Sequence, residues 1–191
     1  MLGIGFGIGG SADGGPARNP LLHLTYQGER LHQGYIISSQ GIDLGLTSLN
    51  TGGFSFIALQ RNQSGSDWMQ PMGSLGLPDD FLVDLPVLLD TGIDEMLLWL
   101  NVDERPPALA NYSQFPSGIE VTITVPSLPD GSAPALQYSF VTGDTGDPMA
   151  PSVVVWRDGR GINTGRNVLA GADYLYDAVS GQIGFRVPPE H

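Results

Sequence analysis

Short apolar runs separated by turn-forming residues are the feature that most constrains how this chain can fold. The sequence holds 27 Gly and 15 Pro, spread along its 191 residues rather than gathered in one low-complexity tract. Gly and Pro at this density favour many tight turns, and therefore short strands over long helices. With 41% hydrophobic residues, the chain can still bury a core. The sequence therefore predicts a folded, all-β protein.

The first part of the chain predicts a meander of three short antiparallel strands. These strands cover residues 35–37, 42–46 and 54–59. Residues 61–80 then become polar and turn-rich, which is typical of a connection. We therefore place a domain boundary near residue 75 and expect two domains, 1–75 and 76–191.

The second domain opens with a mostly apolar segment, from Phe81 to Leu89, whose unbroken run of Val87, Leu88 and Leu89 ends at Asp90. Such a run suits a strand that is buried on both faces, and its end delivers Asp90 into a turn. Residues 96–100 suit a strand or a helix by composition. The remaining predicted elements are strands at 119–125 and 152–156, a short helix at 166–172, and a hairpin formed by 174–177 and 183–187.

Charge and composition exclude several classes of partner. Eight Arg and no Lys stand against 20 Asp and Glu, which gives a net charge of −12. A surface this acidic repels nucleic acid and anionic membranes. The stretch from Met1 to Gly7 has neither a basic leader nor a long apolar run, so we expect no signal peptide or membrane span there. The absence of Cys excludes disulfides and leaves the compartment open.

The remaining metal ligands do not form a recognisable metal site. His23, His32 and His191 are scattered along the sequence. The acidic pairs at 79–80, 94–95 and 103–104 do not follow the spacing of a calcium loop. We therefore predict no metal and no cofactor.

The tripeptide Asp-Thr-Gly occurs twice, and its context separates the two copies. Asp144-Thr145-Gly146 lies among turn-forming residues, where Asp and Gly are common for conformational reasons alone. Asp90-Thr91-Gly92 follows the apolar strand directly, as a catalytic loop requires. Asp90 is therefore the candidate catalytic residue.

Three segments in order resemble the pepsin-like and retropepsin-like aspartic peptidases. They are Val87–Asp94, which resembles the catalytic loop, Ile162–Leu169, which resembles the apolar-apolar-Gly motif and its short helix, and Leu175–Phe185, which resembles the last hairpin. The second departs from the family pattern at Thr164. The resemblance implies an acid-protease β-barrel lobe with one or two short helices. Residues 1–75, beginning with the Gly-rich stretch 2–7, resemble the end of a first pepsin-like lobe.

The same resemblance implies roles for individual residues. Asp90 is the acid/base, Thr91 supports the loop through its hydroxyl, and Gly92 aims its N–H at the carboxylate. Asp94 lies near the substrate groove. Gly165, Arg166 and Asn167 form the structural motif within the second segment.

The chemistry that this family performs needs two aspartates. Two carboxyl groups held close together share one proton and activate a water, which then attacks the peptide carbonyl without metal or covalent intermediate. This chain offers one well-placed Asp-Thr-Gly. A homodimer mate or a complementary lobe would supply the second aspartate for the hydrolysis of a peptide or protein substrate. The alternative is a non-catalytic peptide-binding protein on the same fold.

Overall fold

The computed structural model describes residues 19–126 and 133–188, and this part of the chain is almost entirely β. Single turns of 3-10 helix are the helical elements within it, so the predicted all-β class with short helices is confirmed. The predicted Gly-rich strand at residues 2–7 lies outside the described residues. The elements are η2 (Pro20–Leu22), β1 (Thr25–Tyr26), β2 (Glu29–Arg30), β3 (Gly34–Ser38), β4 (Gly41–Leu44), β5 (Ser55–Ala58), β6 (Met72–Leu77), β7 (Phe81–Leu88), β8 (Met96–Leu100), η3 (Val102–Glu104), β9 (Glu120–Val125), β10 (Leu136–Val141), β11 (Val154–Arg157), β12 (Arg160–Asn163), η4 (Asn167–Ala170), β13 (Asp173–Asp177) and β14 (Gln182–Arg186).

The chain divides into two compact units. The first unit is Pro71–Gly171, and the second combines the described residues before Pro71 with those after Gly171. From the sequence, residues 76–191 are expected to form one domain. In the structure, however, β13 and β14 belong to the second unit, because they pair with β3 and β5.

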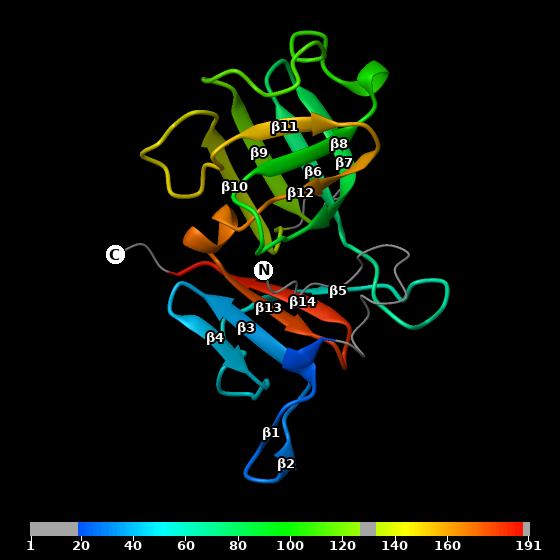
Figure 1. The fold of residues 1–191 in the computed structure, drawn as a ribbon, viewed down its shortest axis with the longest axis vertical. Helices are drawn as coiled ribbons and strands as arrows, with labels where there is room; N and C mark the ends of the chain where they lie inside the picture. The colour runs from blue at the N-terminus through cyan, green and yellow to red at the C-terminus, as the bar shows by residue number, and fades with distance from the viewer. Residues whose placement is uncertain (1–18, 127–132, 189–191) are drawn as a thin grey trace. The chain divides into compact units, whose positions relative to one another are not determined.

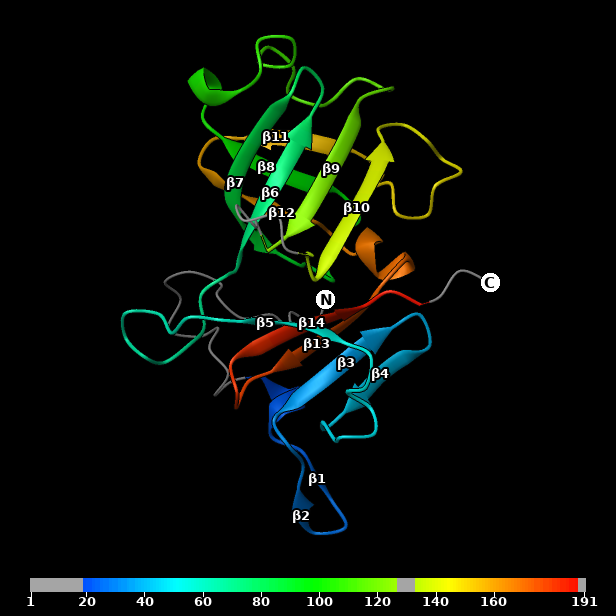
Figure 2. The ribbon, with the colours of Figure 1, turned by 180° about the vertical axis from the view of Figure 1, so that it is seen from behind.

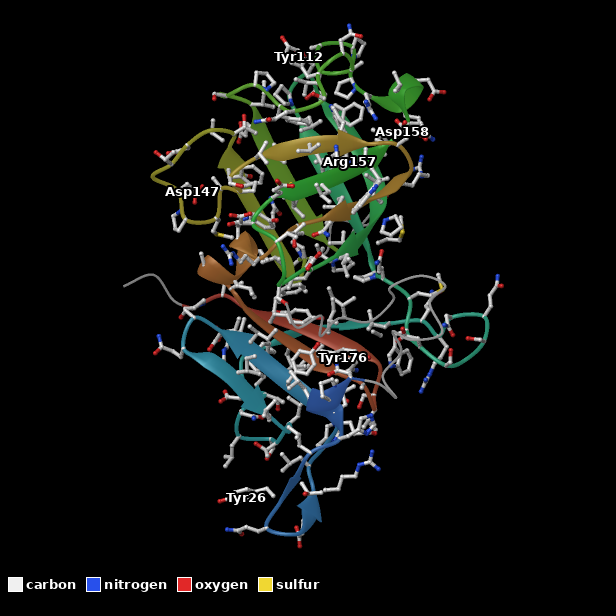
Figure 3. The ribbon with its side chains drawn as sticks, viewed as in Figure 1. Tyr26, Tyr112, Asp147, Arg157, Asp158 and Tyr176 are labelled. Carbon is white, nitrogen blue, oxygen red and sulfur yellow. The ribbon has the colours of Figure 1, made fainter. Side chains whose placement is uncertain are left out.

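A seven-stranded sheet forms the first unit, in the order β10-β9-β6-β7-β12-β8-β11. The sheet curls on itself, so that β8, β11 and β12 lie across one face of β6, β7, β9 and β10 (Figures 1 and 2). Side chains alternate between buried and more exposed along β6, β8, β9 and β10. This period of two places the apolar residues of both layers in one core. Arg157 and Asp158 mark the turn that joins β11 to β12 (Figure 3).

A five-stranded antiparallel sheet forms the second unit, in the order β4-β3-β13-β14-β5. Its centre is apolar: Tyr35 and Tyr176 meet edge to face with ring centroids 5.7 Å apart. Trp68 packs on Gly181 and donates its indole N–H to the Ala178 carbonyl at 3.1 Å. The turn between β13 and β14 is thereby tied to a residue far away in the sequence.

Several predicted elements differ from the observed ones. The meander is correct for β3 and β4, but its third strand, β5, pairs with β14 rather than with β4. Residues 72–77, expected within a connection, form strand β6. Residues 96–100 form a strand. The helix predicted at 166–172 is one 3-10 turn, because Gly165 and Gly171 bound it closely on both sides.

Candidate functional site

Strand order places the Asp90 loop over the end of a third strand. β7 and β8 are consecutive in the sequence, yet β12 lies between them, parallel to β7 and antiparallel to β8. The segment from Leu89 to Glu95, which joins β7 to β8, must therefore pass the end of β12. Asp90, Thr91 and Gly92 lie in this crossing segment, next to the residues with which β12 ends.

Backbone hydrogen bonds fasten the crossing segment to the residues that follow β12. The Thr164 N–H donates to the Leu88 carbonyl at 3.0 Å, and the Arg166 N–H donates to the Ile93 carbonyl at 2.9 Å. The Asn167 side chain adds a third bond, to the Asp94 carbonyl at 2.8 Å. The Asp90 loop is therefore closed on both sides rather than free in solvent.

Gly165 allows the two segments to approach so closely. Its φ is +63°, and a Cβ at this position would overlap the Glu95 carbonyl oxygen and lie 3.2 Å from that of Ile93. Any side chain would force the backbone apart. The requirement for glycine here is steric as well as conformational.

The Asp90 carboxyl is half-buried and held at both of its oxygens. The Gly92 N–H donates to Oδ1 at 2.8 Å. The Asn163 Nδ2 donates to Oδ2 at 3.0 Å. Asn163 itself is only 3% exposed, and its Oδ1 accepts the Gly165 N–H at 2.9 Å. A carboxyl group has about four acceptor positions, so positions remain for a water or a second carboxyl.

The other predicted site residues lie around this carboxyl with different degrees of attachment. Thr91 is half-buried, and its hydroxyl bonds to no residue that the structure describes. Asp94 is exposed, and its carboxylate lies 3.8 Å from the Arg166 guanidinium, with both side chains more than half exposed. An exposed pair of this kind holds little energy. Asp94 positions the loop mainly through its backbone carbonyl, which also accepts the Ser152 N–H at 3.1 Å.

The second Asp-Thr-Gly lies in the exposed loop after β10, which Asp147 marks in Figure 3. The Gly146 N–H donates to the Asp144 Oδ1 at 2.8 Å, which is the same local bond as at Asp90. The other oxygen of Asp144 accepts no hydrogen bond from the part of the chain that the structure describes. Asp144 is thus held at one oxygen and exposed.

Asn163 is the residue of this site that the sequence analysis missed. The family resemblance of Ile162–Leu169 rests on its glycine and on the Arg and Asn that follow the glycine. Asn163 is the last residue of β12, whose last three residues are buried. A buried Asn needs hydrogen-bond partners for its amide, so an Asn directly after the apolar Ile162 is the signal in the sequence that indicates such partners.

The described residues contain neither a cluster of three potential metal ligands nor a helix long enough to cross a membrane. No three His, Asp or Glu side chains among residues 19–126 and 133–188 lie close enough together to hold a metal ion. None of the described helices has the length and hydrophobicity that crossing a membrane requires. Within the same residues, no hydrogen bond or ion pair joins Asp90 to a second carboxyl group.

Comparisons with known proteins give similar solved structures but no family. No protein-family model matches the chain, and no curated protein matches it. Basic 7S globulin from soybean has 14% sequence identity and a TM-score of 0.47, with 82% of this chain and 50% of that chain covered. Conglutin gamma, a basic 7S globulin from lupine seeds, has 13% identity and a TM-score of 0.42, with 82% and 51% covered. This chain spans about half the length of either globulin, and likenesses this distant carry no statement about activity.

Proposed function

We propose that this chain forms one half of an aspartic endopeptidase site, in which Asp90 is the catalytic carboxyl. The observation that carries the proposal is the double attachment of Asp90. Its two oxygens accept hydrogen bonds from Gly92 and Asn163, just after strand β7 and inside a closed loop. A carboxyl that is fixed but still half-exposed has the preorganisation that acid–base chemistry on a bound water requires.

The reaction follows from a pair of such carboxyls. Two aspartates held close together cannot both ionise, so one keeps a proton and the other acts as base on a shared water. The water attacks the peptide carbonyl, the protonated carboxyl donates to the carbonyl oxygen, and a proton passes to the leaving nitrogen. No step needs a cofactor.

The second aspartate in this proposal comes from another polypeptide segment. A second copy of the chain, related by a two-fold axis, would bring its own Asp90 to face the first. A complementary lobe that carries its own aspartate would serve equally. In either arrangement the exposed Asp94 would meet an extended peptide or protein substrate. The Thr91 hydroxyl bonds to no described residue, so backbone hydrogen bonds hold the loop instead of the expected hydroxyl support.

One observation favours the alternative function, which is peptide binding without hydrolysis. The described residues of this chain give Asp90 no carboxyl partner. A groove with a single fixed carboxyl can bind a peptide through its backbone amides but cannot divide the acid and base roles between two groups.

The test uses the purified chain with a denatured protein substrate at about pH 3–6, around the ordinary range of carboxyl titration. If a second copy supplies the partner, we expect cleavage that a pepstatin-type inhibitor abolishes, because such compounds mimic the tetrahedral intermediate. The rate per chain should then rise with chain concentration. Cleavage that persists in excess inhibitor contradicts the proposal. Saturable peptide binding without cleavage at any concentration supports the alternative.

A further inference from the structure

The Asn163 amide lies between Asp90 and the backbone of Gly165, and it uses both of its ends. Its Oδ1 faces the Gly165 N–H at 2.9 Å, and its Nδ2 faces the Asp90 Oδ2 at 3.0 Å. A backbone N–H can only donate, so the amide atom that faces Gly165 must be the oxygen. The amide nitrogen therefore faces Asp90. The direction of this hydrogen bond is set by the backbone.

A carboxyl that is held at one oxygen can still turn about its Cβ–Cγ bond, because this torsion has broad minima. The Gly92 N–H bond to Oδ1 leaves that rotation open. The Asn163 bond to Oδ2 removes it, since two donors on different oxygens define the plane of the group. The remaining acceptor positions of Asp90 then point in fixed directions.

We infer that Asn163 is a positioning residue that sets the plane of the Asp90 carboxyl. Its own burial supports this role: with 3% of its surface exposed, the Asn163 amide meets protein groups rather than bulk water. The catalytic consequence rests on the proposed function, because the fixed acceptor positions matter for rate only if a water and a second carboxyl meet them. The hydrogen bond itself is independent of hydrolysis.

Two substitutions in the same segment separate positioning from loop closure. Asn163→Asp keeps an oxygen for the Gly165 N–H but removes the amide donor toward Asp90 and places a second carboxyl there, so that the two carboxyls share one proton. Thr164→Val is the matched control: the buried Thr164 hydroxyl lies 2.9 Å from the Gly165 carbonyl and 3.4 Å from that of Leu88, without touching Asp90.

The first measurement is the NMR signal of the Asn163 side-chain amide in the whole chain. We expect one of its two protons to be shifted and protected from solvent exchange, unlike the protons of the exposed Asn111. Asp90→Ala removes the shift and the protection, whereas Thr164→Val leaves both unchanged. An Asn163 signal that does not respond to Asp90→Ala overturns the inference, whether or not the chain cleaves peptides.

The second measurement is the split between kcat and KM of the peptidase. We expect Asn163→Asp to lower kcat by about 10²-fold with little change in KM, because Asp90 loses the donor that fixes its plane and shares its proton with the introduced carboxyl. Thr164→Val keeps a kcat near that of the unmodified chain. Equal kcat losses in both variants would mean that Asn163 acts only through loop closure, and the inference fails. An NMR response in a chain without any peptidase activity upholds the positioning of Asp90 and rejects the proposed function.

Discussion

The two Asp-Thr-Gly turns of this protein share a sequence and a local hydrogen bond but differ in what surrounds them. In both turns the glycine N–H donates to the aspartate Oδ1 at 2.8 Å. Asp144 is exposed, whereas Asp90 is half-buried and its second oxygen accepts the Asn163 amide. The tripeptide therefore specifies a turn, and the strands around it determine whether the carboxyl has a fixed orientation.

A third aspartate sharpens this contrast. The Asp177 Oδ1 accepts the N–H groups of Val179 and Ser180 at 2.9 and 3.0 Å, and it pairs with the His32 ring at 2.9 Å. Asp177 accepts more hydrogen bonds than Asp90, but it is buried. All of these donors meet its Oδ1, at the turn of the β13–β14 hairpin. The number of hydrogen bonds therefore does not identify a catalytic candidate. Asp90 is the candidate because its carboxyl is held in place and is still partly exposed to solvent.

Gly165→Ala gives the largest expected change in stability, because it breaks the closure that distinguishes the Asp90 loop. The added Cβ would overlap the Glu95 carbonyl in addition to adopting a positive φ. We expect a loss of roughly 3 kcal/mol in the free energy of unfolding, measured by urea denaturation. Gly118→Ala is the control, because its φ is +91° with open space around it, and should cost roughly 1 kcal/mol. Equal losses would mean that close approach at Gly165 is unimportant.

The glycines also show why the sequence predicted some strands and missed others. The apolar residues of β7 predicted this strand directly, but the expectation that it is buried on both faces is wrong, because its side chains alternate between more and less exposed. β6 was missed because its two glycines resemble a turn, yet a Cβ at Gly73 would lie only 2.5 Å from a Val87 methyl and 2.7 Å from the Thr124 carbonyl. Gly73 marks close packing between strands. Only the neighbouring strands reveal this, and they are distant in the sequence.

The position of Asp90 in the candidate site could be predicted from the sequence, but its hydrogen bond to Asn163 could not. Asp90 follows the apolar run, so its position at a strand end follows from local pattern. The insertion of β12 between β7 and β8 brings Asn163 to Asp90. These two residues are 73 positions apart in the sequence, so the contact is long-range. The pairing of β5 with β14 is long-range in the same way. Local periodicity carries no signal for either.

Asp177→Asn tests the third aspartate through pH. Burial raises the pKa of Asp177, but hydrogen bonds from Ser180 and His32 outweigh it, so the net pKa is below its ordinary value. A carboxyl with a lowered pKa stabilises the fold above its unfolded-state pKa and loses this contribution as pH falls through the folded value. We expect Asp177→Asn to destabilise the protein by about 1 kcal/mol at neutral pH, and this loss should shrink at acidic pH as the pH falls through the lowered folded-state pKa of Asp177.

Trp68 provides the readout, because its indole contacts the Asp177 turn. Tryptophan fluorescence during urea unfolding is followed at neutral and acidic pH, with Trp68 contributing the signal of this unit and Trp99 and Trp156 that of the first unit. Asp144→Asn serves as the control and should leave the unfolding curve unchanged at either pH. A loss that is equally large at neutral and acidic pH would contradict the role of the Asp177 charge.

The Arg166 to Asp94 pair gives the smallest expected effect. Both side chains are more than half exposed and 3.8 Å apart, so Arg166→Ala should change the free energy of unfolding by only about 0.3 kcal/mol at low salt. Added salt should remove the difference, because it screens exposed charges. A double-mutant cycle with Asp94→Asn measures the pair alone. A coupling that survives high salt would show that the pair contributes more to the Asp90 loop than its exposure indicates.

The initial rate of protein hydrolysis by Asp90→Asn and Asp144→Asn tests the central claim most directly. Both substitutions keep an oxygen for the glycine N–H and remove one ionisable carboxyl from an Asp-Thr-Gly turn. We predict that Asp90→Asn lowers the rate on the order of 10⁴-fold and that Asp144→Asn leaves it within about twofold of the unmodified chain. Equal rates for the two variants, or a larger loss in Asp144→Asn, would contradict the assignment of Asp90 as the catalytic carboxyl.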